Sequence, residues 1–208
     1  MYKAIVRMDA FQWAGVGSSL LQIIILLVFY GDQVYVSDLL ARVVPYKVVI
    51  TVFVFAQAAL FCMYLYRTRH EQLTASLLGL TSIVTYITGW IMLSIQWNDS
   101  SNAHRAGAGI FMFGIGATVL LMTALCRKHM IPAVAMAVLF LFGLVCGIAF
   151  VFRFYAEGED AWIFEHWSFI AAICIQMIFF SLKSPSPLPA VVYSSMPRIE
   201  PSHIQRAV

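Results

Sequence analysis

Residues 133–145 read AVAMAVLFLFGLV, an apolar run without a charged side chain. Five other blocks of similar character occupy most of the 208-residue chain. The six blocks are Trp13–Tyr30, Tyr46–Tyr66, Leu73–Gln96, Ala106–Cys126, Ile131–Phe152 and Ala161–Leu182. Each is close to the ~20 residues with which a helix crosses a hydrocarbon layer about 30 Å thick. The sequence therefore predicts an all-α membrane protein, a bundle of six transmembrane helices.

The composition favours helices over a membrane barrel. Hydrophobic residues make up 62% of the chain and charged residues 11%. Strands of a barrel alternate apolar and polar residues, whereas Leu21–Val28 and Ala133–Val145 are almost continuously apolar. A helix also satisfies all its backbone groups within one segment in lipid. No clear small-x-small cleavage site precedes Tyr30, so the first block is expected to remain as a span.

The Lys and Arg residues predict the orientation of the bundle. On the side that holds both termini lie Lys3, Arg7, Arg67, Arg69, Arg127, Lys128, Lys183, Arg198 and Arg206. On the other side lie Arg42, Lys47, Arg105 and Arg153. Because the more positive side faces the cytoplasm, both termini are expected there. The positive charge is explained by orientation, and no basic cluster indicates nucleic-acid binding.

The expected organisation is a cytoplasmic N-terminal lead at residues 1–12, a transmembrane domain at 13–182 and a disordered cytoplasmic tail at 183–208. The tail is rich in Ser and Pro and has no apolar helical face. Within it, Tyr193-Ser-Ser-Met196 fits the sorting pattern that clathrin adaptors bind, although so short a pattern also arises by chance. Asn98 begins a glycosylation sequon beside the third block.

The four cysteines, Cys62, Cys126, Cys146 and Cys174, lie within or at the ends of the blocks, so no disulfide is expected. Cys126 stands next to Arg127 and Lys128, which allows either palmitoylation or an ordinary buried cysteine at the end of a span.

Glycines in two blocks predict close helix packing. Gly107 and Gly114 are one heptad apart, as are Gly109 and Gly116, and the two pairs lie on nearly opposite faces of one helix. That helix is therefore expected to admit two close neighbours. The next block adds a small-xxx-small pair, Gly143 and Gly147.

Polar residues at the non-cytoplasmic ends of spans four and six form the first candidate site. They are His104 and Arg105 in span four, and Glu165 and His166 in span six. Two interpretations remain open: a buried lumenal or extracellular cluster that ties the spans together or contacts a lipid, or separate side chains hydrated in the interface. Deeper in the spans, Gln22, Gln57 and Gln176 are expected to donate interhelical hydrogen bonds rather than to bind ligands.

Catalytic and transport signatures are weak. The sequence has no H-x-x-x-H or H-E-x-x-H spacing, no G-x-S-x-G elbow and no phosphate-binding loop. No lone acid or base lies at mid-membrane, and no internal repeat typical of transporters is visible. We therefore expect no enzyme, no metal and no cofactor, with a small transporter or channel as a remaining alternative.

Three segments resemble the DRAM/Sfk family, the damage-regulated autophagy modulators and their relatives. Residues 103–116 are similar to the family's fourth-span signature, Val34-Tyr-Val-Ser-Asp38 to its Pro-Tyr-Ile-Ser-Asp element, and Ile163-Phe-Glu-His-Trp167 to the opening of its sixth span. Val34 in place of Pro, Leu39-Leu40 in place of Thr-Gly and the inserted His166 mark a divergent member. The positions carried over are Tyr35, Ser37, Asp38, His104, Gly107 and Glu165.

The resemblance implies a non-enzymatic regulator or scaffold that contacts membrane lipids and a membrane-protein partner. Some relatives promote autophagy in lysosomes, and others help to organise a phosphoinositide kinase at the plasma membrane. A further branch acts in the Golgi on the lipid of GPI anchors, which is the alternative function. An endosomal or lysosomal membrane is the expected location, with the plasma membrane or Golgi as alternatives and a clathrin adaptor as a partner of the tail.

The resemblance also suggests a mechanism. The loop after the first span, anchored by Asp38, is expected to fold over the outer ends of spans four and six. It would then meet His104, Arg105 and Glu165 and form a polar cap.

Overall fold

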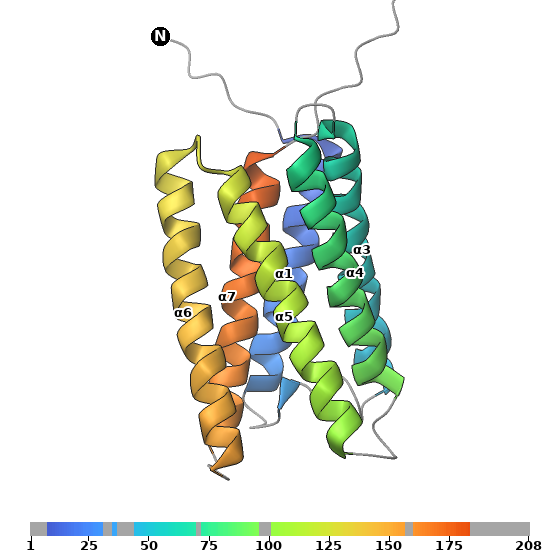
Figure 1. Ribbon diagram of the computed structural model, residues 1–208, viewed down its shortest axis with the longest axis vertical. Coiled ribbons are helices and arrows are strands. Elements are labelled where there is room, and N and C mark those ends of the chain that lie inside the picture. The colour runs from blue at the N-terminus through green and yellow to red at the C-terminus, as the bar shows by residue number, and fades with distance from the viewer. Residues whose placement is uncertain are drawn as a thin grey trace, which may run out of the picture.

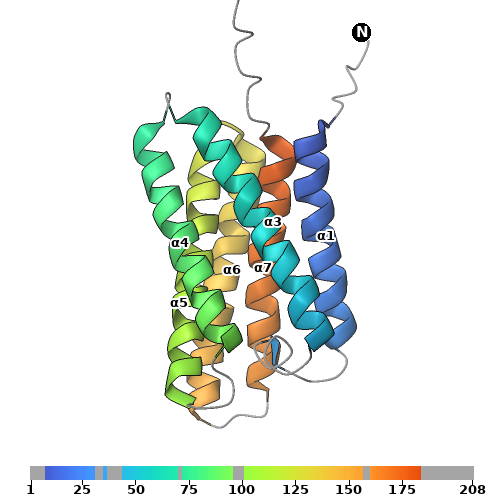
Figure 2. The same ribbon diagram turned by 90° about the vertical axis from the view of Figure 1, so that its right-hand side faces the viewer.

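The structure is a computed structural model that describes residues 8–30, 35–36, 44–69, 72–95, 101–156 and 160–183. These residues form α-helices and short connections, with no strand among them. The helices are α1 (Ala10–Tyr30), α3 (Val44–Thr68), α4 (Leu73–Ile95), α5 (Ser101–Leu125), α6 (Met130–Tyr155) and α7 (Ala161–Leu182). Figures 1 and 2 show them running alongside one another in a single bundle.

All six of these helices are long and apolar enough to cross a membrane. The prediction of a six-helix transmembrane bundle is therefore confirmed, and the protein is an integral, multi-pass membrane protein. The start of α1 and the end of α7 lie at the same end of the bundle (Figures 1 and 2). That both face the cytoplasm stays a prediction from the charge count.

The first helix starts inside the segment that the sequence assigned to the lead. The backbone N–H of Gln12 donates to Asp9 Oδ1 at 2.8 Å, and Asp9 N–H donates to Gln12 Oε1 at 3.0 Å. This reciprocal pair is a capping box, which satisfies two otherwise unpaired N–H groups at the start of a helix. The Gln12 amide also donates to the carbonyl of Ser181 at 3.0 Å, so it joins the start of α1 to the end of α7.

Helix α7 is the centre of the bundle and α6 is its periphery. In α7, 67% of the candidate span is buried, against 11% in α6. Figure 1 shows α6 at one edge of the bundle, beside α7 and one end of α5. The exposed side chains of α6 are large and apolar, among them Ile131, Val138, Leu141, Val145 and Phe152. In a membrane these side chains face lipid, whereas Glu165, His166, Ser168 and Gln176 of α7 are enclosed by protein.

Helices α4 and α5 pack with their backbones in close contact. A Cβ atom added to Gly89 of α4 would collide with the backbone of Phe111, and one at Gly114 of α5 with the backbone of Tyr86. At Gly107 the added atom would lie 2.8 Å from the backbone nitrogen of Leu93. The heptad pair Gly107 and Gly114 therefore faces α4, where only the absence of a side chain permits this approach.

The other glycines of α5 and α6 have more space. A Cβ atom at Gly109 or Gly116 would meet no atom within 4 Å among the described residues. The structure thus brings one close neighbour to the glycines of α5, on one of its two small faces. On α6, an added Cβ at Gly143 would lie 3.1 Å from the Cβ of Ala171 in α7, and one at Gly147 would lie 3.9 Å from the Cε of Met112 in α5.

Several sequence predictions fall outside the described residues. They concern Ser37, Asp38, Asn98, Tyr193, Met196 and the tail from residue 184 onward. His104 and Arg105 belong to the first turns of α5, but their side chains are likewise outside the description.

Candidate functional site

A contact between the loop after α1 and the start of α7 lies near the non-cytoplasmic end of the predicted topology. The backbone N–H of Val36 donates to Glu165 Oε2 at 2.6 Å. Both residues are enclosed, with Glu165 3% and Val36 2% exposed. Because a carboxyl group is costly to bury without partners, this hydrogen bond gives Glu165 a structural reason to lie inside the bundle. We call this contact the Val36–Glu165 clamp.

The residue before Val36 attaches the same segment to α6. The ring of Tyr35 packs edge-on against Phe150 and Phe154, at centroid distances of 6.3 and 6.0 Å. Edge-to-face aromatic pairs of this kind each contribute about 0.5–1.5 kcal/mol beyond the area they bury. Residues 35–36 are therefore held by α6 on one side and by α7 on the other.

His166, next to Glu165 in the chain, turns toward different neighbours. It is fully buried, and its ring packs edge-on against Tyr30 and Trp162, at 5.6 and 5.8 Å. His166 Nδ1 lies 3.0 Å from the carbonyl oxygen of Trp162, so that nitrogen carries the proton in the neutral ring. His166 Nε2 has no hydrogen-bond partner among the described residues. Glu165 thus contacts the loop after α1, whereas His166 contacts the end of α1 itself.

Of the polar cluster predicted from sequence, the structure describes the side chains of Tyr35, Glu165 and His166. It joins Tyr35 and Glu165 through the segment 35–36. It does not describe the side chains of Ser37, Asp38, His104 and Arg105, so their meeting with Glu165 stays a prediction.

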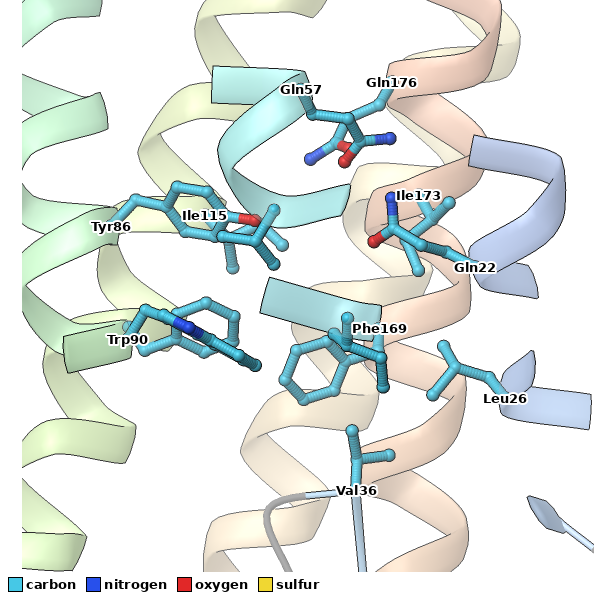
Figure 3. Close-up of a pocket in the computed structure, with 13 residues that line it drawn as sticks. Gln22, Leu26, Val36, Gln57, Tyr86, Trp90, Ile115, Phe169, Ile173 and Gln176 are labelled. Carbon is cyan, nitrogen blue, oxygen red and sulfur yellow. The ribbon is translucent and has the colours of Figure 1, made fainter. Parts of the chain in front are cut away.

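Between the clamp and the middle of the bundle lies a cavity of about 30 Å³. Its lining comes from α1, α3, α4, α5, α7 and Val36. The lining residues are Gln22, Leu26, Val36, Ile50, Val54, Gln57, Tyr86, Trp90, Phe111, Ile115, Phe169, Ile173 and Gln176. Figure 3 shows Gln57 and Gln176 at one end of this cavity and Val36 at the other. The clamp therefore holds the residue that lines one end of the cavity.

Three glutamines from three helices meet at this cavity. Gln22, Gln57 and Gln176 are all buried, at 6%, 4% and 3% exposure. Gln57 donates to the Ser19 hydroxyl at 2.9 Å, an α3 to α1 hydrogen bond of the kind expected from sequence. Gln22 instead donates to the carbonyl of Ser18 in its own helix, at 3.3 Å. The convergence of the three amides on one cavity was not predicted, because their spacing along the chain carries no sign of it.

Other polar side chains join the helices around the cavity. Trp90 Nε1 donates to Thr51 Oγ1 at 3.1 Å, which links α4 to α3. The Thr118 hydroxyl donates to Ser82 Oγ at 3.1 Å, linking α5 to α4. Hydrogen bonds between membrane helices contribute about 0.6 kcal/mol each on average. They set the relative rotation of the helices, and so determine which side chains reach the cavity.

Cys126 lies at the predicted cytoplasmic end of α5, outside the candidate span. Its side chain is fully buried, and burial raises the pKa of its thiol while the nearby Lys183 ammonium opposes that rise. Since the thiolate is the reactive form, a buried thiol of raised pKa is a poor nucleophile. The structure thus favours the buried-cysteine interpretation over palmitoylation at this position.

We expect Cys126 to react slowly with maleimide. At pH 7.4 its labelling should be at least about tenfold slower than that of Arg127→Cys in a Cys126→Ser background, because Arg127 is exposed. Labelling of Cys126 should also rise at a higher pH than labelling of the exposed control. Peptide-resolved mass spectrometry after timed labelling measures both rates. Equal rates for the two positions would contradict the burial of Cys126.

Comparison of the chain with protein-family models, with curated proteins and with solved structures finds no match. The DRAM/Sfk resemblance therefore stays a prediction from the three sequence segments. Two of those segments, residues 34–38 and 163–167, contain the two partners of the Val36–Glu165 clamp.

Proposed function

We propose that this chain is a non-enzymatic, multi-pass membrane regulator or scaffold of the DRAM/Sfk type. In this role it modulates the autophagy and lysosome system or the organisation of phosphoinositides at the plasma membrane. The observation that supports the proposal is the Val36–Glu165 clamp, at 2.6 Å. It joins two segments that carry the resemblance and lie 129 residues apart in sequence. If the chain shares the fold of that family, the two segments are expected to contact each other, and this hydrogen bond is such a contact.

The proposed mechanism uses the outer end of the bundle. The segment 35–36 is held between α6 and α7, and its Val36 lines one end of the central cavity. A lipid or protein that binds at this end would bias whether the segment stays in place, and the bundle would transmit that change to its cytoplasmic side. This mechanism requires that the lipid or protein has a different affinity for each of the two positions of segment 35–36. It involves no chemical reaction.

The location of the protein in the cell distinguishes the autophagy branch of this proposal from the phosphoinositide branch. We would compare the tagged chain with a Tyr193→Ala variant, using Ser195→Ala as the control inside the same four-residue pattern. Lysosomal signal that moves to the cell surface in Tyr193→Ala, but not in Ser195→Ala, is the expected result for an autophagy modulator. Plasma-membrane signal in all three would favour the phosphoinositide branch.

The GPI-remodelling alternative predicts a different set of results. It expects Golgi signal unaffected by Tyr193→Ala, together with reduced surface levels of GPI-anchored proteins after deletion of the gene. Normal GPI-anchored protein levels combined with lysosomal location would reject this alternative. Loss of those proteins would instead reject the non-enzymatic regulator as the main function.

A further inference from the structure

The central cavity contains polar atoms whose hydrogen-bonding capacity is unused. Gln57 Oε1 and Gln176 Oε1 are buried and have no hydrogen-bond partner among the described residues. Both side chains line the same cavity, and Figure 3 shows their amide groups at the same end of it. A buried amide oxygen without a partner costs about 1–3 kcal/mol, so two of them at one cavity call for a common partner.

A hydrogen-bond relay determines which end of the Gln57 amide faces the cavity. The Ser19 hydroxyl donates its one proton to the carbonyl of Gly15, at 2.9 Å. Ser19 Oγ can therefore only accept, and it accepts from Gln57 Nε2 at 2.9 Å. The amide oxygen is consequently left to the cavity, so this position offers an acceptor rather than a donor.

Two free acceptors restrict the chemistry of the occupant. An ionised carboxylate or a phosphodiester has no proton to donate to them, so neither of these groups fits. A cation would be buried without a counter-charge, because the residues that line the cavity are amides, aromatics and aliphatics. A neutral group that donates a hydrogen bond remains.

The size of the cavity limits the occupant further. A water molecule occupies about 10–15 Å³, so a cavity of about 30 Å³ has room for water or for the polar end of a larger molecule. Leu26, Val54, Phe169 and Ile173 surround that volume with apolar surface. This combination suits a hydroxyl group at the end of an apolar molecule.

We propose that the cavity is a binding site for a neutral hydroxyl group, which donates hydrogen bonds to Gln57 Oε1 and Gln176 Oε1. In a membrane that hydroxyl comes from an uncharged lipid or from water. This inference does not depend on the organelle that contains the protein or on the family to which the chain belongs. Because Val36 lines the end of the cavity opposite the glutamines, we expect the Val36–Glu165 clamp to influence whether the occupant is enclosed.

The experiment uses the full chain in phosphatidylcholine nanodiscs and two matched probes. One probe is a diacylglycerol with a diazirine near the glycerol, and the other is its acetate ester, which lacks only the hydrogen-bond donor. Cross-linked peptides are identified by mass spectrometry in the wild type, Gln176→Met and Gln57→Met. The control is Thr81→Val, which removes an exposed hydroxyl that donates to Leu77 of its own helix. Thermal unfolding of all four proteins is measured without probe.

The expected result is labelling of α3 or α7 that is about fivefold stronger with the free hydroxyl than with the acetate, the change expected of one neutral hydrogen bond. Either glutamine variant should remove this preference, and Thr81→Val should keep it. If no preference appears but Gln176→Met lowers the unfolding temperature by about 2–4 °C, the proposed site stands with water as the hydroxyl. If no preference appears and Gln176→Met raises the unfolding temperature, the cavity is dry and the proposal is overturned.

Discussion

Replacing Gly114 by leucine is expected to prevent the bundle from assembling. A Cβ atom at this position already collides with the backbone of Tyr86, so even the first carbon of a side chain forces α4 and α5 apart. Backbone atoms, unlike the end of a flexible side chain, cannot turn away. Overpacking a well-packed interior costs about 1–3 kcal/mol when side chains can adjust, and the cost here should exceed that range.

The matched control is Gly116→Leu, two residues further along the same helix. A Cβ atom at Gly116 meets nothing within 4 Å among the described residues, so leucine there should be tolerated. Yield of monodisperse protein in detergent and its unfolding temperature provide the measurement. We expect Gly114→Leu to aggregate or fail to accumulate while Gly116→Leu behaves like the wild type. Equal behaviour of the two variants would show that α4 and α5 are not in close contact at Gly114.

Gly114 and Gly116 also show which parts of the fold can be predicted from the sequence. Apolar length was enough to predict six spanning helices, because burial of backbone groups in lipid leaves few other structures. The sequence could not distinguish Gly114 from Gly116, since both are glycines at heptad spacing on one helix. In lipid the outward faces are as apolar as the inward faces, so hydrophobic periodicity does not indicate which face has a neighbour.

The candidate site, too, could be predicted only in part from the sequence. Glu165 was found because a carboxyl group in a span is unusual, and its partner is a backbone N–H, which no sequence motif encodes. Glu165 and His166 were predicted as one cluster at one depth. Successive residues of a helix point in directions about 100° apart, and the structure accordingly gives the two side chains different neighbours. The three glutamines line one cavity only when α1, α3 and α7 have the correct rotation relative to one another, so the cavity could not be predicted from the sequence.

The second large effect is expected at Glu165. Glu165→Ala leaves the N–H of Val36 without its acceptor inside the bundle, and it removes the contact that holds the segment 35–36 against α7. The loss of a buried partner costs about 1–3 kcal/mol, which lowers the unfolding temperature of a chain of this size by several degrees. Glu165→Gln keeps an acceptor oxygen at the same reach and should recover part of the loss.

Asp160→Ala is the control, because it removes a carboxylate from the connection that leads into α7. Asp160 pairs with Arg153 at 3.3 Å, but both side chains are about half exposed. Solvent screens such a pair, so its removal should change stability by at most about 1 kcal/mol. The expected order, from most to least destabilised, is Glu165→Ala, Glu165→Gln and Asp160→Ala. Burial separates both Glu165 variants from Asp160→Ala, and the acceptor oxygen that glutamine keeps separates Glu165→Gln from Glu165→Ala.

Stability alone does not show that the clamp closes the cavity, so a second measurement is needed. In a Val36→Cys background, Glu165→Ala should increase the rate at which a membrane-impermeant maleimide reaches residue 36. Without Glu165 the segment loses its anchor on α7, whereas Tyr35 still packs against Phe150 and Phe154 on α6. Asp160→Ala should leave that rate unchanged. If Glu165→Ala destabilises the protein but residue 36 stays protected, the carboxyl group supports the fold without controlling access to the cavity, and the enclosure of an occupant must then depend on the aromatic contacts of Tyr35.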